Sequence, residues 1–128
     1  MSKQVIKTDK APAPIGPYNQ AIKANGFVFI SGQVAFDPVN NELKMATIQE
    51  ETHQVMKNLQ AILTEAHLTF DHIVKTSIFL SDMGLFAAVN EVYATYFNGD
   101  EPARETVAVK TLPRNVNVEI SMIAVEAL

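Results

Sequence analysis

Arg104 is the residue of this sequence whose neighbours best equip it for chemistry. The segment 104–109 alternates like a strand, and the face that carries Arg104 otherwise carries only Thr106 and Ala108. Small side chains beside a long one leave room for a ligand, and the planar fork of a guanidinium suits a carboxylate or a phosphate. The alternative is a surface arginine that pairs with Glu101 or Glu105, in the kind of exposed ion pair that is common and weak.

Glu119 is the candidate acid. The segment 116–122 also alternates, and Asn117, Glu119 and Ser121 share its polar face. Arg104 and Glu119 therefore fall on the polar sides of consecutive strands, and if those strands pair, both charges reach the same groove. There the carboxylate either neutralises the arginine or stands apart and holds a water molecule, and the sequence leaves both alternatives open.

Three further segments supply groups that could line such a groove. The stiff segment 11–18, with three prolines and a glycine, ends at Tyr18, which either presents its hydroxyl to a ligand or packs its ring on the core. Ser31 offers a hydroxyl and Gly32 permits a bulge or a close backbone approach, although the pair also fits an ordinary strand end. Asn90 lies at the edge of an apolar helical stripe, where it either ties down a loop or lines a pocket.

Composition narrows the class of protein. The chain has 128 residues, of which 48% are hydrophobic and 19% charged, as expected for a globular domain. It has no cysteine, which excludes disulfides and thiolate chemistry, and it has no apolar run long enough to span a bilayer. The first residues lack the apolar core of a secretory signal, so we expect a cytoplasmic protein. The net charge of −4 and the scattered lysines and arginines argue against nucleic-acid binding.

The elements that must position these residues follow from periodicity and turn signals. Asn25-Gly26 separates two strand-like segments and is a strong hairpin signal, because both turn residues must accept positive φ. A second turn is expected at 37–41. Besides the two segments above, four strands are predicted: Lys3–Thr8, Asn19–Ala24, Phe27–Ser31 and Ile73–Leu80.

Two amphipathic helices are predicted. The first begins at a capping box of Thr47 and Glu50, and its apolar stripe runs from Ile48 to Ala66. Its polar residues fall mostly outside that stripe: Glu50, Glu51, Gln54, Lys57, Asn58 and Glu65, with His53 as a solvated histidine. The second helix spans about 83–97, with Ser81-Asp82 as its N-cap and Gly99 as its C-cap.

This order, β-β-β-α-β-α-β-β, predicts an α+β fold in which one mixed sheet has two helices on one face. We find no linker or internal repeat, and we expect a single domain over residues 1–128. Two helices can cover only one face of the sheet, and the other still carries valine, isoleucine and phenylalanine. Since a large apolar surface usually marks an interface, we expect a homo-oligomer whose subunits pack sheet faces together.

Six motifs together resemble the RidA (YjgF/YER057c/UK114) family of reactive-intermediate deaminases. They occur in the same order over essentially the whole chain: Gly16-Pro17-Tyr18, Ser31-Gly32-Gln33, Ile73-Val74-Lys75-Thr76, Val89-Asn90-Glu91-Val92-Tyr93, Pro102-Ala103-Arg104 and Val118-Glu119-Ile120. The resemblance implies a chorismate-mutase-like fold and a homotrimer with pockets between subunits. It also implies hydrolysis of 2-iminobutanoate and 2-iminopropanoate, released by pyridoxal-phosphate dehydratases, to 2-oxo acids and ammonia.

The resemblance also implies roles for individual residues. Arg104 matches the arginine that clamps the substrate carboxylate, and Glu119 matches the acid that positions the attacking water. Four residues match pocket positions, namely Tyr18, Ser31, Gly32 and Asn90. No metal or organic cofactor is implied, because an iminium is already electrophilic.

Two residues depart from the family pattern. Thr106, which we also expect to line the pocket, stands where many members have cysteine. Glu105 occupies a position that is usually small or apolar, and strand alternation predicts that it points away from the site. These departures are the main support for one alternative, a non-catalytic trimer that binds small carboxylates or acts as a chaperone. A second alternative is an endoribonuclease or translation inhibitor, an activity ascribed to some family members, and the acidic balance of the chain argues against it.

Overall fold

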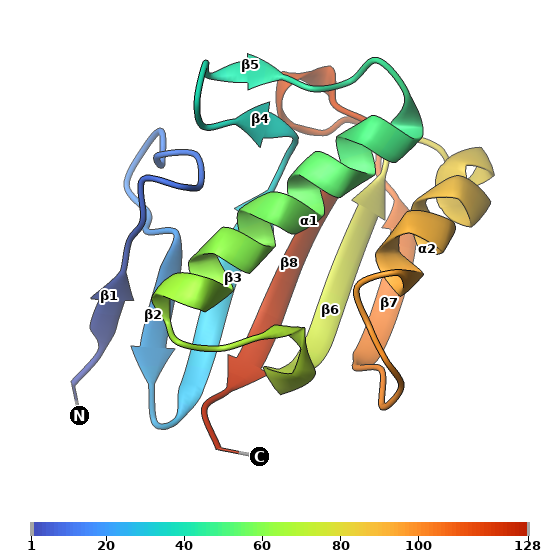
Figure 1. Ribbon diagram of the computed structural model, residues 1–128. Helices are drawn as coiled ribbons and strands as arrows, with labels where there is room; N and C mark the ends of the chain where they lie inside the picture. The colour runs from blue at the N-terminus through green and yellow to red at the C-terminus, as the bar shows by residue number, and fades with distance from the viewer. Residues whose placement is uncertain (1, 128) are drawn as a thin grey trace.

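A six-stranded sheet forms the centre of the protein, which we describe over residues 2–127 from a computed structural model (Figure 1). Its strand order is β1-β2-β3-β8-β6-β7, and all neighbours are antiparallel except the parallel pair of β6 and β7. The strands are β1 Gln4–Ile6, β2 Ala21–Ala24, β3 Phe27–Gln33, β6 Ile73–Leu80, β7 Ala103–Ala108 and β8 Val118–Val125. Two helices, α1 Ile48–Glu65 and α2 Phe86–Ala94, cover one face.

The order of elements confirms the predicted α+β class and its β-β-β-α-β-α-β-β sequence. The expected turn at 37–41 closes a small additional hairpin of β4 Phe36–Asp37 and β5 Glu42–Leu43. The Asn25-Gly26 turn is also confirmed, because both residues have positive φ, 52° and 80°. This conformation matches the twist of the strands β2 and β3 that the turn joins.

The Arg104 strand and the Glu119 strand do not pair, so the condition for a shared groove within one chain is not met. Strand β6 lies between β7 and β8, with Thr76 opposite Arg104 and Phe79 opposite Glu119. Thr76 is fully buried beneath the helices, so Arg104 points to the helix-covered face. Phe79 and Glu119 alternate with buried neighbours and point to the other face. The two charges of one chain therefore lie on opposite faces of the sheet.

Helix α1 begins as predicted but buries more than its apolar stripe. The Thr47 hydroxyl accepts a hydrogen bond of 3.0 Å from the Glu50 N–H, as expected for its N-cap. Glu51 and Asn58, which we assigned to the polar side, are 0% and 1% exposed. His53 is not simply solvated, since its Nδ1 lies 2.8 Å from the Tyr96 hydroxyl.

Helix α2 is shorter than predicted. The Asp82 carboxylate accepts from the Gly84 N–H at 2.6 Å and caps a 3-10 turn, Met83–Leu85, from which α2 continues. The helix ends at Ala94 with Thr95 as its C-cap, so the expected C-cap at Gly99 is wrong. Gly99 still adopts a positive φ of 102°, in the turn that follows.

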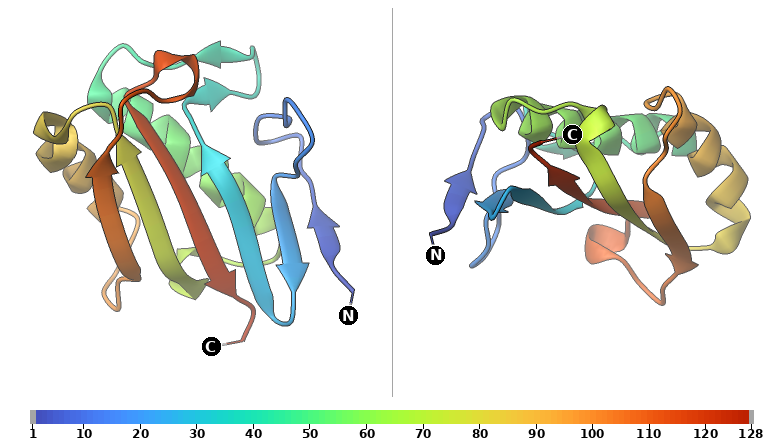
Figure 2. Two further views of the ribbon diagram at one scale, coloured as in Figure 1. Left: turned by 180° about the vertical axis from the view of Figure 1, so that it is seen from behind. Right: turned by 90° about the horizontal axis from the view of Figure 1, so that it is seen from below.

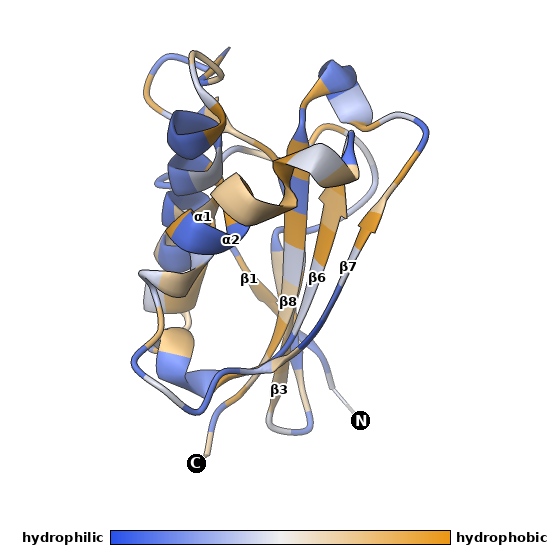
Figure 3. Cartoon of the chain, turned by 90° about the vertical axis from the view of Figure 1, so that its right-hand side faces the viewer, coloured by the Kyte–Doolittle hydropathy of each residue, from blue (hydrophilic) through white to orange (hydrophobic). Residues whose placement is uncertain are grey.

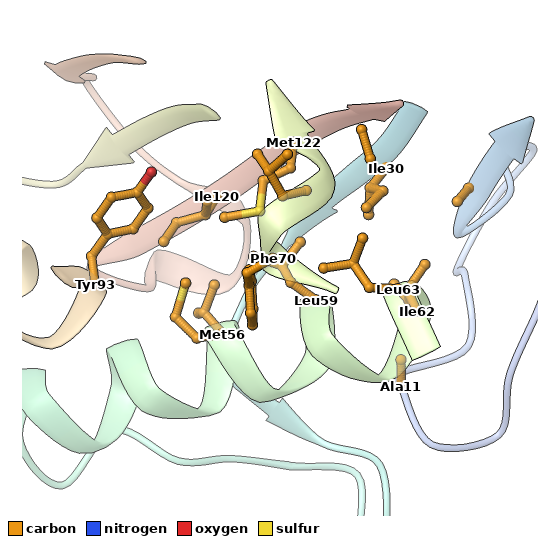
Figure 4. Close-up of a cluster of buried hydrophobic side chains, with 14 of the residues drawn as sticks. Ala11, Ile30, Met56, Leu59, Ile62, Leu63, Phe70, Tyr93, Ile120 and Met122 are labelled. Carbon is orange, nitrogen blue, oxygen red and sulfur yellow. The ribbon is translucent and has the colours of Figure 1, made fainter. Parts of the chain in front are cut away.

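The hydrophobic core fills the space between the helices and the sheet. Figure 4 shows side chains of α1, including Met56, Leu59 and Ile62, directed toward Ile120 and Met122 of β8. All five are at most 2% exposed. Figure 3, seen edge-on, shows both helices on the same side of the sheet. No helix among the described residues is long and apolar enough to cross a membrane.

Neither α1 nor α2 lies on the other face of the sheet (Figure 2, left). Phe27 and Phe29 of β3 alternate there with buried residues and are 42% and 46% exposed, and their ring centroids lie 6.0 Å apart. Val5 of β1 and Val107 of β7 are exposed on the same face. We call this surface the open face. The described residues leave its large apolar side chains exposed, and exposed apolar surface of this kind usually marks an interface.

Candidate functional site

The Arg104 side chain is held between an amide and two aromatic rings of α2. Its Nη1 donates a 2.7 Å hydrogen bond to the Asn90 side-chain oxygen. Its guanidinium carbon lies 5.1 Å from the Tyr93 ring centroid and 5.6 Å from that of Phe86. Phe86, Asn90 and Tyr93 stand four and three residues apart, which places them on one side of the helix. Contacts of a cation with two rings orient the guanidinium without neutralising it.

No carboxylate neutralises Arg104 within residues 2–127, since the ion pairs of that part of the chain involve other residues. The guanidinium is half-buried on β7, the last strand of the sheet. The alternative of a surface pair with Glu101 or Glu105 is therefore wrong for this chain. An oriented arginine with most of its donors unused is suited to a bidentate contact with a small carboxylate.

Tyr93, whose ring faces the Arg104 guanidinium, is itself fixed by a hydrogen bond in the core. Its hydroxyl donates to the Thr76 hydroxyl at 3.0 Å inside the core. Burial raises the pKa of Tyr93, although the hydrogen bond with Thr76 and the nearby Arg104 charge partly oppose this rise. The ring therefore stays neutral and presents its face to the guanidinium.

The neighbours of Arg104 on β7 separate as strand alternation predicts. Thr106 lies on the same face as Arg104, and its hydroxyl oxygen is buried without a hydrogen-bond partner in the described part of the chain. Glu105 points to the open face, where it pairs with Lys75 Nζ at 2.9 Å and accepts a hydrogen bond from Ser77 Oγ. The hydrogen bonds from Ser77 and Lys75 lower the pKa of Glu105. Its charge therefore does not face Arg104, as expected.

Glu119 lies on the open face, against the backbone of Gly32. A Cβ placed on Gly32 would collide with the Glu119 carboxylate, 2.9 Å from Cδ and 3.1 Å from Cγ. The pairing of β3 with β8 shifts register between Ile30 and Gln33, so the strand is irregular at Gly32, where the sequence left a bulge, a close backbone approach or a plain strand end open. The carboxylate makes no hydrogen bond or ion pair with any residue in 2–127, and burial raises the pKa of Glu119.

A cavity of about 440 Å³ opens beside Glu119. Tyr18 stands at its wall with 51% of its surface exposed, so its ring does not pack on the core. Arg114 lines the same cavity, and its guanidinium lies 5.3 Å from the ring centroid of Phe36. Ser31 is not part of this lining. Its hydroxyl donates to the Asn19 carbonyl at 2.6 Å, in a neighbouring groove that also contains Tyr18.

The predicted site residues thus form two separate groups. Arg104, Asn90 and Thr106 gather on the helix-covered face at the sheet edge, and Tyr18, Gly32 and Glu119 gather at the cavity on the open face. Phe86 and Tyr93 were not predicted as site residues, and their contact with the guanidinium is new. The signal was present, because their spacing brackets Asn90 on one side of a helix. No group of three or more histidine, aspartate or glutamate residues in 2–127 is placed to hold a metal ion.

These observations define a class: small α+β proteins with two helices on one face of a mostly antiparallel sheet and an oriented, unpaired arginine at its edge. Comparison with known sequences identifies the family. The sequence model of the endoribonuclease L-PSP family matches residues 8–126, and the chain belongs to this family, which is also called RidA or YjgF.

Relatives of known name cover nearly the whole chain. A 2-iminobutanoate/2-iminopropanoate deaminase of Mus musculus is 48% identical over 97% of this chain and 92% of its own length. A RutC family protein of Pyrococcus abyssi is 46% identical over 97% of this chain and 98% of its own.

Solved structures show the same fold. A Rid family protein of Yersinia pestis superposes with a TM-score of 0.94 at 46% identity, covering 97% of this chain and 99% of the other. TdcF of E. coli, whose crystal structure contains bound serine, superposes with a TM-score of 0.92 at 36% identity, over 97% and 99% of the two chains.

Proposed function

We propose that this protein hydrolyses 2-imino acids such as 2-iminobutanoate and 2-iminopropanoate to 2-oxo acids and ammonia. The observation that carries the proposal is the guanidinium of Arg104, held by Asn90, Phe86 and Tyr93 without a neutralising acid. The name of the mouse relative supports the same reaction. The serine bound to E. coli TdcF, a ligand with a carboxylate next to an amino-bearing carbon, supports a substrate of this shape.

We infer that the complete site forms between two copies of the chain in a homotrimer. Arg104 occupies the edge strand, from which a side chain can reach a neighbouring subunit, whereas Glu119 occupies the open face. That face exposes Phe27, Phe29 and Val107, and burial of these apolar side chains against another subunit would be favourable. A cyclic assembly repeats one such contact around its axis, so that every Arg104 meets the Glu119 of the next chain.

The chemistry follows from the two groups. Arg104 binds the carboxylate of the substrate through paired N–H donors and fixes the position of C2. Glu119 accepts a proton from a water molecule as its oxygen attacks C2 of the iminium, which gives a tetrahedral aminoalcohol. The proton then passes from Glu119 to the amino group. As the C–N bond breaks, the hydroxyl oxygen forms the carbonyl and its proton returns to Glu119, which passes it to the departing ammonia, so that the products are the 2-oxo acid and ammonium. The raised pKa of Glu119 makes its carboxylate a stronger base than an ordinary glutamate.

A coupled assay tests the proposed function. Purified threonine dehydratase generates the enamine and imine of 2-oxobutanoate, and the appearance of 2-oxobutanoate is timed with and without this protein. We expect the protein to accelerate the release of 2-oxobutanoate beyond the spontaneous rate. Semicarbazide, which traps the imine, reports that intermediate directly in a parallel reaction. An unchanged rate would reject the deaminase, and calorimetric binding of 2-oxobutanoate without acceleration would instead support a carboxylate-binding trimer.

The close approach of Gly32 to Glu119 gives a further prediction. In Gly32→Ala the new methyl group displaces the carboxylate, which is the flexible end of its side chain, so we expect the protein to fold. Displacement of a catalytic group by about 1 Å costs on the order of 10²-fold in rate. We therefore expect kcat to fall at least tenfold while the melting temperature changes by only a few degrees.

Gly26→Ala is the matched control. Gly26 has a positive φ of 80° and nothing within 4 Å of an added Cβ, so this change strains only the hairpin turn. We expect a loss of about 1 kcal/mol of stability with unaltered kcat. Full activity in Gly32→Ala would show that Glu119 does not need its present position.

A further inference from the structure

Glu51 is a buried carboxylate that links helix α1 to the beginning of strand β8. It is 0% exposed, in the first turn of the helix. Its Oε2 accepts hydrogen bonds from the backbone N–H of Asn117 at 2.7 Å and from that of Val118 at 3.1 Å. Its Oε1 accepts from the Asn117 side-chain amide at 2.9 Å. Three donors thus converge on one side chain from a part of the chain 66 residues away.

The bonded segment is also fixed from its other side. The Ser81 N–H donates to the Asn117 carbonyl at 3.0 Å, and the Ser81 hydroxyl donates to the Asn117 side-chain oxygen at 3.0 Å. Asn117 is therefore held between α1 and the end of β6. Glu119 follows two residues later, and its Cα lies opposite Phe79 in the β6 register. Any shift at Asn117 and Val118 passes directly to Glu119.

A buried carboxylate that joins a helix to a strand carries a free-energy cost. Burial of a charge is unfavourable unless its lone pairs are satisfied, and an apolar side chain in its place would leave the backbone N–H groups of Asn117 and Val118 without this acceptor. What the carboxylate adds is direction, because it fixes two consecutive backbone N–H groups at once. The buried carboxylate therefore fits a role in positioning the backbone at 117 and 118, and not in stability alone.

Two other buried polar side chains act on the same cavity. Gln20 donates to the carbonyls of Ala11 and Pro12 at 3.2 and 2.9 Å. Asn58 donates to the carbonyls of Val34 and Phe36 at 3.1 and 2.8 Å. Each therefore ties a segment that contributes to the wall beside Glu119, since the cavity lining includes Pro12, Val34 and Phe36. Glu51 does the same for the segment that carries Glu119 itself.

We propose that Glu51 is a positioning residue for the reaction: it fixes the backbone at 117 and 118 and so places the Glu119 carboxylate against Gly32, where it can hold the attacking water. This inference rests on the proposed function. It assigns to Glu51 no contact with substrate, and its effect on rate acts entirely through Glu119.

The test compares Glu51→Ala, Glu51→Asp and Glu51→Gln in the coupled assay. The glutamine oxygen can still accept both backbone N–H bonds, and its NH2 group can donate to the Asn117 side-chain oxygen once that amide turns over. The shorter aspartate reaches neither backbone N–H without moving the strand. We therefore expect kcat to fall about 10–100-fold in the alanine and aspartate variants and less than about threefold in the glutamine variant. KM should change little in all three, because Arg104 still binds the carboxylate.

Thr52→Val is the control in the same turn of α1. Thr52 is 0% exposed, and its hydroxyl donates to the Ile48 carbonyl at 2.8 Å, one turn earlier along the helix. We expect a loss of stability without a change in kcat per folded subunit. If Glu51→Ala does not fold, the aspartate variant carries the test, since it keeps a carboxylate at the same position.

A spectroscopic readout separates this inference from the proposed function. The carboxyl group of Glu119 is titrated by carbon-13 NMR in wild type and in Glu51→Asp, where Tyr18 and Arg114 of the cavity wall stay unchanged. Release of Glu119 from Gly32 admits water, so we expect its pKa to fall toward the ordinary glutamate value. A wild type without turnover would reject the deaminase but leave this readout. Normal kcat and an unchanged Glu119 pKa in folded Glu51→Asp would overturn the positioning role.

Discussion

Replacement of Arg104 by alanine is expected to lower kcat/KM for the imine more than any other single change in this protein. The substitution removes the cation that binds the substrate carboxylate and leaves that carboxylate without a charged partner at the site. The loss of one member of a buried charge pair costs about 3–5 kcal/mol, which corresponds to a decrease of about 10²–10⁴-fold in kcat/KM. The coupled dehydratase assay measures it directly.

Arg104→Lys sharpens this prediction. Lysine keeps the charge but lacks the planar fork that donates to Asn90 and stacks on Tyr93 and Phe86. We expect the lysine variant to recover only a small part of the lost activity and to show a raised KM. Lys57→Met, which removes an exposed cation from the outer surface of α1, is the control and should be fully active. Full activity in Arg104→Ala would exclude the proposed mechanism.

Much of the fold follows from local patterns. The limits predicted for β6, Ile73–Leu80, coincide with the strand, because alternation and flanking turn residues agree there. The Asn25-Gly26 turn and the Thr47 N-cap follow from backbone chemistry within four residues. Helix α2 is less well predicted, since its last turn competes with packing of Tyr96 and Phe97 against Phe70.

Strand order is not a local property, and this is why the sequence alone could not show whether the two charges share a groove. Nothing in β7 or β8 indicates that β6 lies between them. The crossover through α2 makes β7 pair in parallel with β6, so that β8 can pair only on the other side of β6. Alternation tells which residues share a face of one strand, but it does not tell which face of the sheet that is.

The buried acid of α1 escaped prediction for a related reason. Periodicity assigns Glu51 to the polar side because the residue is charged, although its angular position borders the apolar stripe. Its burial depends on three donors contributed by Asn117 and Val118, far away in the sequence. Whether a glutamate at the edge of a predicted apolar stripe is buried or exposed therefore cannot be told until its partner strand is known.

Glu119→Gln is expected to abolish most of the catalysis while leaving ligand binding nearly intact. The amide cannot accept a proton from water, and loss of a general base typically costs about 10²–10⁴-fold in kcat. Because burial raises the pKa of Glu119 and the deprotonated form is the active base, wild-type kcat/KM should fall as pH decreases through that raised pKa. This acid limb should lie above the pH expected of an exposed glutamate and should be absent from the residual activity of the glutamine variant.

Mixing the two inactive variants tests the shared site. Arg104 and Glu119 of one chain lie on opposite faces of the sheet, so a complete site needs Arg104 from one subunit and Glu119 from another. When Arg104→Ala and Glu119→Gln chains are unfolded together and refolded in equal amounts, about one quarter of the sites receive both native residues. We expect about that fraction of wild-type activity. Arg104→Ala refolded with the double variant should remain inactive, because no chain then supplies Arg104. Absence of recovery in the mixture, or a dilute monomer in light scattering that still turns over, would show that each chain works alone.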